Sequence, residues 1–127
     1  MQATVLLLDD EATVRESLSR YLGSSGFNVV DAASADEAFE CMKSDVFDAF
    51  ILDVRLPESR SGLEVLHFVR LCDESADRPV FILTGSVLSE DEEEIIRRFG
   101  AYVFYKPYGY GEIVGRLQQM TGLARCA

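Results

Sequence analysis

Short apolar runs alternate with amphipathic stretches along the whole chain. The apolar runs are five to seven residues long and rich in Val, Ile, Leu and Phe, which is typical of buried strands. They are Thr4–Leu8, Phe27–Asp31, Phe47–Asp53, Pro79–Thr84 and Ala101–Tyr105. After each run, apolar residues recur at helical spacing, which predicts five helices. A strand–helix unit repeated five times predicts an α/β fold, a doubly wound parallel sheet with right-handed crossovers.

Local signals mark where several of these helices begin and end. Ser34 followed three residues later by Glu37 predicts a capping box at the start of the second helix. In the first helix, Val14, Leu18, Tyr21 and Leu22 form the predicted inner face, with Gly23 or Gly26 at its end. The third helix is predicted from its inner-face residues Leu63, Leu66 and Val69. The fourth is predicted over Ser89–Phe99, with Gly100 as its cap, and the fifth from about Gly111 to Met120.

The central run, Phe47–Asp53, is almost continuously apolar, which suits a strand covered by helices on both faces. It closes on Asp53, and pairing should stop by Pro57, because proline has no backbone N–H to donate. An acidic side chain at the carboxyl end of a central parallel strand lies where open α/β sheets place their chemistry. The same residue could simply start a turn, and this run alone leaves both interpretations open.

Polar residues also close three of the other runs. Asp9 and Asp10 follow the first, Thr84 ends the fourth, and Lys106 follows the fifth. Because the carboxyl ends of parallel strands share one edge, we expect these side chains to meet Asp53 there.

Such a cluster needs a cation. Two carboxylates about 5 Å apart repel by roughly 3 kcal/mol at an effective dielectric of 20. Lys106 supplies one positive charge, and the all-oxygen donor set favours Mg²⁺ for the rest. A carboxylate beside such an ion can attack phosphorus and form an aspartyl-phosphate. Thr84 could then hydrogen-bond one phosphoryl oxygen and Lys106 could neutralise another, while Gly85 leaves room for the group.

Composition limits the alternatives. A chain of 127 residues fits one domain, and a net charge of -10 disfavours direct nucleic-acid binding. The apolar runs are too short to span a membrane or to form a signal peptide, so a cytoplasmic location is expected. Cys41, Cys72 and Cys126 lack metal-site spacing, and His67 lies in a helical pattern, which favours a helix-face residue over a catalytic one.

The segments LLLDDE, ILDVRLP, ILTG and YKPY together resemble a response-regulator receiver domain of two-component signalling, of the chemotaxis-regulator type. The resemblance implies that Asp53 is the phosphoacceptor, with Thr84 as the switch hydroxyl and Lys106 as the phosphate-binding lysine. It also implies a Mg²⁺ site made by Asp9, Asp10, Asp53 and the backbone carbonyl of Arg55.

The resemblance further implies a single receiver domain over residues 1–127, with a short tail from about 122. Its sheet would have the order 2-1-3-4-5, flanked by five helices. The phosphoryl donor would be a sensor histidine kinase or phosphotransfer protein. An output domain or effector protein would respond, or a self-dimer would form through the face made by the fourth helix, fifth strand and fifth helix.

Three departures from the family pattern stand out. Gly62 lies nine residues after Asp53 instead of eight, which predicts a loop one residue longer over 58–61. Val103 occupies the usual switch-aromatic position, three residues before the lysine, which puts the threonine–aromatic coupling in doubt. Gly109 and Gly111 weaken the start of the last helix, so the fifth strand and its neighbours could be remodelled.

Two other functions remain as alternatives. A Mg²⁺-dependent phosphohydrolase usually has a second Asp two residues after its nucleophile, where this chain has Arg55. A degenerate receiver would act as an interaction module without phosphorylation. The acidic segment 90–94 (EDEEE) fits either a solvated helix start or a docking patch for a basic partner.

Overall fold

The computed structural model describes residues 2–122, apart from the side chain of Ser59. Five parallel strands form one sheet of order β2-β1-β3-β4-β5, which confirms the predicted fold class and the strand order. The strands are β1 (Thr4–Leu8), β2 (Asn28–Ala32), β3 (Ala49–Asp53), β4 (Val80–Thr84) and β5 (Tyr102–Tyr105). The tail from residue 123 onward, with Cys126, lies outside the described residues.

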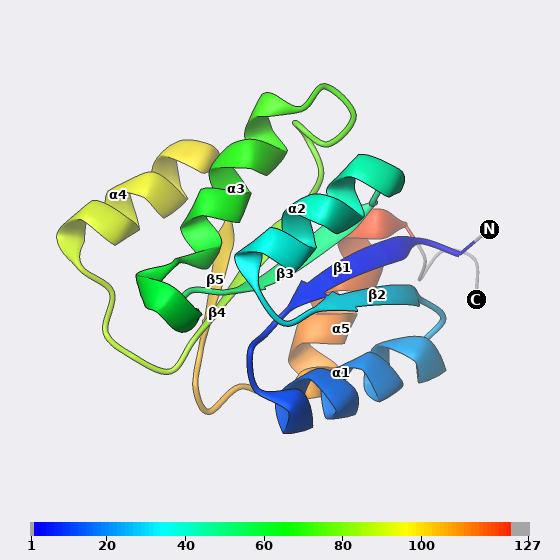
Figure 1. Cartoon of the computed structure of the whole chain (residues 1–127). Coiled ribbons are helices and arrows are strands. Elements are labelled where there is room, and N and C mark those ends of the chain that lie inside the picture. The colour runs from blue at the N-terminus through cyan, green and yellow to red at the C-terminus, as the bar shows by residue number, and fades with distance from the viewer. Residues whose placement is uncertain (1, 123–127) are drawn as a thin grey trace.

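Helices cover both faces of the sheet (Figure 1). On one face lie α1 (Ala12–Ser24) and α5 (Tyr110–Thr121); on the other lie α2 (Ala35–Ser44), α3 (Gly62–Leu71) and α4 (Glu90–Phe99). Alternate residues of each strand feed the two cores, so Leu6 and Leu8 pack toward α2–α4 while Val5 and Leu7 pack toward α1 and α5. This double covering explains why the strand runs are almost continuously apolar.

Some predicted boundaries were wrong by one or two residues. β3 begins at Ala49 instead of Phe47, because Asp48 closes the strand entry by hydrogen bonds. Its carboxylate accepts from the Thr4 N–H at 2.8 Å, and its own N–H donates to the Thr4 carbonyl at 2.8 Å. α1 runs through Gly23, and Gly26 adopts the left-handed conformation with φ 101°. Tyr21 was predicted to face inward, but it is exposed.

The structure confirms Ser34 as the N-cap of α2, but the predicted capping box there was wrong. Ser34 accepts from the Glu37 N–H at 3.2 Å, but the Glu37 carboxylate reaches the Ala33 N–H instead of completing the box at Ser34. At α4, Ser89 and Glu92 form a complete reciprocal capping box. Gly100 ends that helix in the left-handed conformation, with φ 69°.

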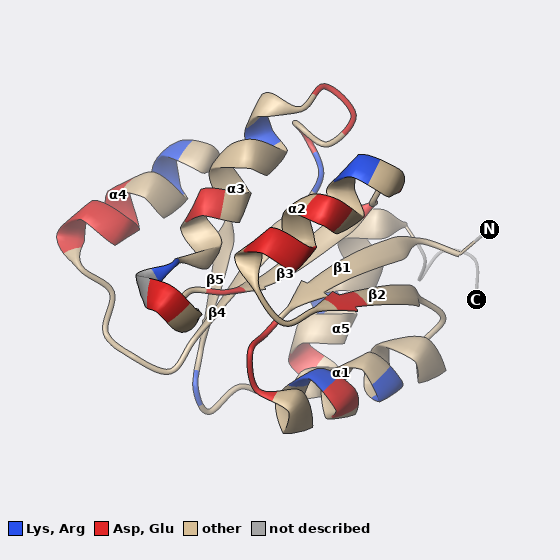
Figure 2. Cartoon of the chain, in the orientation of Figure 1, with Lys and Arg blue, Asp and Glu red and all other residues tan. Residues whose placement is uncertain are grey.

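α4 is attached to the domain by few buried side chains. Of its ten residues, all of them described, Ile96 is the one that is buried, and Phe99 packs at the rim. Its carboxyl end is held by Arg70 of α3, which donates to the carbonyl of Phe99 at 2.6 Å. The same guanidinium donates to the Arg78 carbonyl at 2.7 Å, which ties the end of α4 to the α3–β4 loop. Figure 2 shows that acidic residues gather on the first turns of this helix.

Candidate functional site

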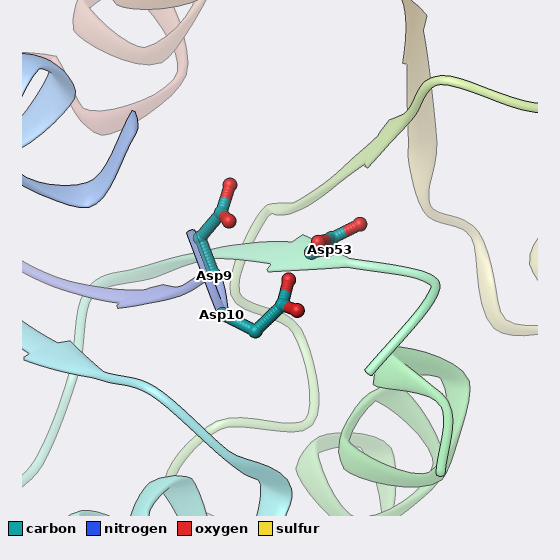
Figure 3. Close-up of side chains that lie close together, drawn as sticks. All are labelled: Asp9, Asp10 and Asp53. Atoms are coloured by element: carbon teal, nitrogen blue, oxygen red, sulfur yellow. The ribbon is translucent and has the colours of Figure 1, made fainter. Parts of the chain in front are cut away.

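Three carboxylates meet at the carboxyl edge of the sheet. Asp9 and Asp10 follow β1, and Asp53 ends the neighbouring strand β3 (Figure 3). Each offers an oxygen, and these oxygens all lie within 4.8 Å of one another. The parallel register that pairs Leu8 with Leu52 brings the two strand ends to the same height. The structure therefore brings the carboxylates of Asp9, Asp10 and Asp53 together, as the sequence predicts.

Backbone groups fix the orientation of two of these side chains. The Glu11 N–H donates to Asp9 Oδ1 at 2.8 Å, and the Arg55 N–H donates to Asp53 Oδ1 at 3.3 Å. Both are bonds from the residue two positions ahead, which is a common way for Asp to close a turn. Each carboxylate therefore starts a turn and also faces its neighbour, so the two readings of Asp53 are compatible.

Burial and crowding make these carboxylates unusually basic. Burial, followed by the negative charge of Asp9, raises the pKa of Asp53 from 3.8 to about 7. Burial also raises the pKa of Asp9, whose side chain is among the few buried polar ones in the described chain, and the charge of Asp10 adds to this. A bound cation would relieve both effects, because it favours the ionised carboxylates.

The donor set fits a hard divalent cation. Carboxylate oxygens are the ligands preferred by Mg²⁺ and Ca²⁺, and a site with protein ligands on one side leaves positions for water and substrate oxygens. Asp9, Asp10 and Asp53 are the residues in the described part of the chain that could hold such an ion together. This cluster is therefore a candidate site for a divalent cation.

Thr84 and Lys106 stand on the adjoining strand ends. The Thr84 hydroxyl is buried and forms a small turn, donating to the Ser86 carbonyl at 3.0 Å and accepting from the Ser86 N–H at 3.2 Å. Lys106 Nζ lies 3.5 Å from Glu11 Oε1, beside the acidic cluster. The lysine stem crosses Gly85, where an added Cβ would approach Lys106 Cδ to 3.0 Å. Gly85 therefore makes room for the lysine that reaches toward the site.

The loop beside the site, between Asp53 and Gly62, contains a tight turn. Pro57–Ser59 forms a 3-10 turn (η1), within which Glu58 adopts φ 64°, a left-handed conformation that non-glycine residues seldom take. Arg55 and Ser61 form an isolated antiparallel bridge across the base of the loop. Gly62 then packs directly on β3, where a Cβ would lie 2.0 Å from the Asp53 carbonyl oxygen. Gly62 makes this contact at a position nine residues after Asp53.

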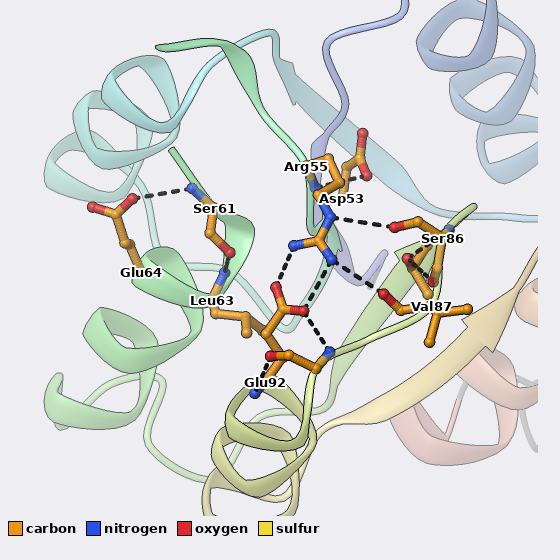
Figure 4. A network of polar contacts seen from close by, with 10 residues as sticks. Asp53, Arg55, Ser61, Leu63, Glu64, Ser86, Val87 and Glu92 are labelled. Carbon is orange, nitrogen blue, oxygen red and sulfur yellow. Dashed lines mark hydrogen bonds and ion pairs between the residues drawn. The ribbon is translucent and has the colours of Figure 1, made fainter. Parts of the chain in front are cut away.

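A network around Arg55 was not predicted from the sequence (Figure 4). The Arg55 guanidinium forms a bidentate ion pair with Glu92 of α4, with Nη2 2.9 Å from Oε1 and Nη1 bonded to Oε2. It also donates to Ser86 Oγ at 3.2 Å and to the Val87 carbonyl at 3.3 Å. The pair holds the pKa of Glu92 down at about 2. Glu92 is thus bonded to Arg55, which neither a solvated helix start nor a docking patch predicts.

The fifth strand has a changed aromatic pattern. Val103 packs at the margin of the core under α2–α4, and Phe104 points to the other face against Phe81, with ring centroids 5.1 Å apart. Tyr105 is the register partner of Thr84 and is 54% exposed. An aromatic residue therefore does adjoin Thr84, one strand over and two positions beyond Val103.

The other residues singled out from the sequence lie away from this site. His67 is an exposed residue of α3 whose ring lies 5.1 Å from that of Phe99. Cys41 in α2 and Cys72 at the end of α3 are free, partly buried thiols. No helix among residues 2–122 combines the length and the apolar character needed to cross a membrane.

Comparisons with known proteins agree with this geometry. A family model described as the response regulator receiver domain matches residues 5–118. The chain is 34% identical over 117 residues to the probable transcriptional regulatory protein TcrX of Mycobacterium tuberculosis, covering 92% of this chain and 49% of that protein. It thus spans about half the length of this curated relative, and of the transcriptional regulatory protein YvrH of Bacillus subtilis, which is 31% identical and covered to 48%.

Among solved structures, the chemotaxis protein CheY4 of Vibrio cholerae superposes with a TM-score of 0.83 at 28% identity, covering 94% of this chain and 99% of that one. A response regulator from Burkholderia pseudomallei, whose structure holds a phosphorylated aspartic acid, a calcium ion and citrate, gives a TM-score of 0.77 at 26% identity. It covers 98% of this chain and 72% of that one.

Proposed function

The chain belongs to the response-regulator receiver family of two-component signalling, and on this premise we propose that it accepts a phosphoryl group on Asp53. The observation that carries the proposal is the cluster of three carboxylates at the carboxyl edge of the sheet, with Thr84 and Lys106 on the adjoining strand ends. Receivers are signalling modules and do not turn over outside substrates, so the phosphohydrolase alternative is set aside.

The transfer begins with Asp53, whose ionised carboxylate oxygen attacks the phosphorus of a phosphohistidine. The new O–P bond forms as the P–N bond breaks, and the electron pair of that bond returns to the imidazole nitrogen. The Glu11 and Arg55 N–H groups hold Asp9 and Asp53 in place for this step. Reversal of the signal is hydrolysis, in which water attacks phosphorus, inorganic phosphate leaves and the Asp53 carboxylate is restored.

Asp9, Asp10, Asp53 and the backbone carbonyl of Arg55 would hold a divalent cation, for which we propose Mg²⁺. When bound, such an ion would offset the charge of these carboxylates and of the incoming phosphoryl oxygens. Lys106 lies beside the cluster and supplies a further positive charge for one phosphoryl oxygen. The Thr84 hydroxyl, now bonded to Ser86, would turn to another oxygen, which would shift the β4–α4 loop.

The partners we propose are a sensor histidine kinase or phosphotransfer protein as donor, acting in the cytoplasm, and an output domain or effector as recipient. The face formed by α4, β5 and α5 is a candidate for the effector or for a self-dimer. It exposes Tyr102 and Tyr105, with the Arg116 guanidinium 5.4 Å from the centre of the Tyr102 ring. The net charge of -10 argues against direct nucleic-acid binding by this domain.

The test is intact-mass spectrometry after incubation with acetyl phosphate and Mg²⁺, on wild type and on Asp53→Asn. We expect one phosphoryl adduct on wild type, absent from the variant and absent without Mg²⁺. If a folded wild-type protein gives no adduct with acetyl phosphate or with a phosphorylated kinase, the domain is a phosphorylation-independent interaction module.

A further inference from the structure

Arg55 joins the phosphorylation site to a helix that is distant in sequence. Its backbone N–H contacts the Asp53 carboxylate, and its guanidinium grips Glu92, which lies 37 residues later in the first turn of α4. The same guanidinium holds the β4–α4 loop through Ser86 and the Val87 carbonyl (Figure 4). One side chain therefore connects the phosphoacceptor turn with both the loop and the helix.

Glu92 has two tasks at once. Its Oε1 accepts from the Ser89 N–H at 2.8 Å, which closes the capping box. The same carboxylate forms the bidentate ion pair with the Arg55 guanidinium. The Glu92 side chain is 17% exposed and that of Arg55 is 51% exposed, so the bond lies at the rim of the site, where another anion can reach the guanidinium. The pKa of Arg55 is raised mainly by its hydrogen bond to Glu92, and the negative charge of Asp53 makes a smaller contribution in the same direction.

The two ends of α4 are held differently. Arg70 fixes the carboxyl end through carbonyl groups that carry no net charge and belong to the scaffold. Arg55 fixes the amino end through a carboxylate, beside a residue that gains charge on phosphorylation. Ile96 is the one buried residue of this fully described helix, and Leu88, just before the N-cap, is the buried side chain nearest its amino end. The Arg55–Glu92 ion pair is the charged contact that adds to Leu88 at this end.

We propose that Glu92 and the phosphoryl group on Asp53 compete for the Arg55 guanidinium, so that phosphorylation releases the amino end of α4. This proposal rests on the proposed function, and in it the Arg55–Glu92 ion pair transmits phosphorylation of Asp53 to α4. A phosphoryl group carries more negative charge than the carboxylate it replaces, and a guanidinium binds either anion by the same bidentate geometry. Glu92 is then a positioning residue, which keeps Arg55 turned away from the phosphoacceptor until phosphorylation.

Competition of this kind is reciprocal. If the phosphoryl group weakens the Arg55–Glu92 bond, removing the Glu92 charge strengthens binding of a phosphoryl mimic by the same factor. For a partly exposed ion pair we expect about two- to five-fold. The gain requires Arg55, so it should vanish when Arg55 is replaced as well.

The experiment uses beryllofluoride with Mg²⁺ as the phosphoryl mimic. Its affinity is measured for wild type, Glu92→Gln, Arg55→Gln and the double variant, with Glu93→Gln as matched control. Glu93 is exposed on the same helical turn, so its variant removes the same charge without touching Arg55. We expect tighter binding for Glu92→Gln alone. Glu93→Gln should match wild type, and the double variant should match Arg55→Gln.

Amide hydrogen exchange gives a second readout that does not depend on affinity. The mimic should speed exchange in residues 86–94 of wild type and leave residues 96–99, held by Arg70, unchanged. Arg55→Lys keeps the positive charge but cannot form the bidentate ion pair with Glu92. Without the mimic, residues 86–94 should therefore exchange faster in this variant than in wild type.

The inference is overturned if Glu92→Gln and Glu93→Gln bind the mimic equally, or if the mimic leaves exchange in residues 86–94 of wild type unchanged. Failure of the proposed function looks different, because folded wild type would then not bind the mimic in the presence of Mg²⁺.

Discussion

Replacing Asp53 with Asn is expected to stabilise the fold when divalent cations are absent. In wild type, burial and Asp9 raise the pKa of Asp53 from 3.8 to about 7, so its ionised form is unfavourable in the folded protein. At 1.36 kcal/mol for each pKa unit this would be about 4 kcal/mol. The carboxylate keeps some contact with solvent, which reduces the expected gain to about 2 kcal/mol.

The pH dependence has a definite sign. A carboxyl group whose pKa is higher in the folded state binds more protons there than in the unfolded chain, so wild type loses stability as pH rises from about 4 to about 7. Asn does not titrate. The stability gap between Asp53→Asn and wild type should therefore be about 2 kcal/mol at pH 8 and shrink below about 1 kcal/mol at pH 5.

Urea unfolding in EDTA at the two pH values measures this gap. Asp73→Asn is the matched control, because it removes the same charge from an exposed position on the α3–β4 loop. A gap as large at pH 5 as at pH 8, or a similar gap for Asp73→Asn, would refute the argument, because the effect would then come from general charge repulsion instead of the site.

Three further outcomes test other parts of the structure. Mg²⁺ should raise the melting temperature of wild type more than that of Asp10→Asn; equal shifts in thermal unfolding would remove Asp10 from the metal site. Gly62→Ala should destabilise by about 2 kcal/mol or more, because its Cβ would lie 2.0 Å from the Asp53 carbonyl oxygen, whereas Gly115→Ala in α5, with open space around its Cβ, should stabilise by up to about 1 kcal/mol in urea unfolding. Val103→Ala should leave phosphorylation intact and alter mainly packing or partner binding; loss of the phosphoryl adduct in a folded variant would contradict this.

The fold was largely predictable because its signals are local. The run Thr4–Leu8 is apolar along its whole length and became β1 with the predicted bounds. Ser89 and Gly100 mark the ends of α4 by capping chemistry that needs only neighbouring residues. The site was predictable for a topological reason, since parallel strands bring Asp9 and Asp53 to one edge however far apart they lie in sequence.

What was missed depends on side chains that meet across long separations. Nothing near Arg55 indicates that its partner is Glu92, and nothing in the acidic segment distinguishes Glu92 from Glu93. Tyr21 has helical spacing but lies just outside the covered stripe of α1, where it meets Tyr110 edge to face at 6.0 Å. The spacing of Gly62 from Asp53 predicted a longer loop. The left-handed conformation at Glu58 within that loop could not be predicted, because Glu58 is not Gly or Asn, the residues that usually adopt it.

The loop that contains Glu58 is closed at its base by hydrogen bonds. Its length can therefore change without changing the positions of Gly62 and Asp53. Leu56 N–H donates to the Arg60 carbonyl at 3.2 Å, and the Gly62 N–H donates to the Val54 carbonyl at 3.0 Å, so both arms are fastened before the turn begins. A peptide grafted between Pro57 and Arg60 would project from the fastened arms without shifting Gly62 or Asp53. This turn is therefore a position where a label or an epitope can be inserted while the carboxylate cluster keeps its geometry.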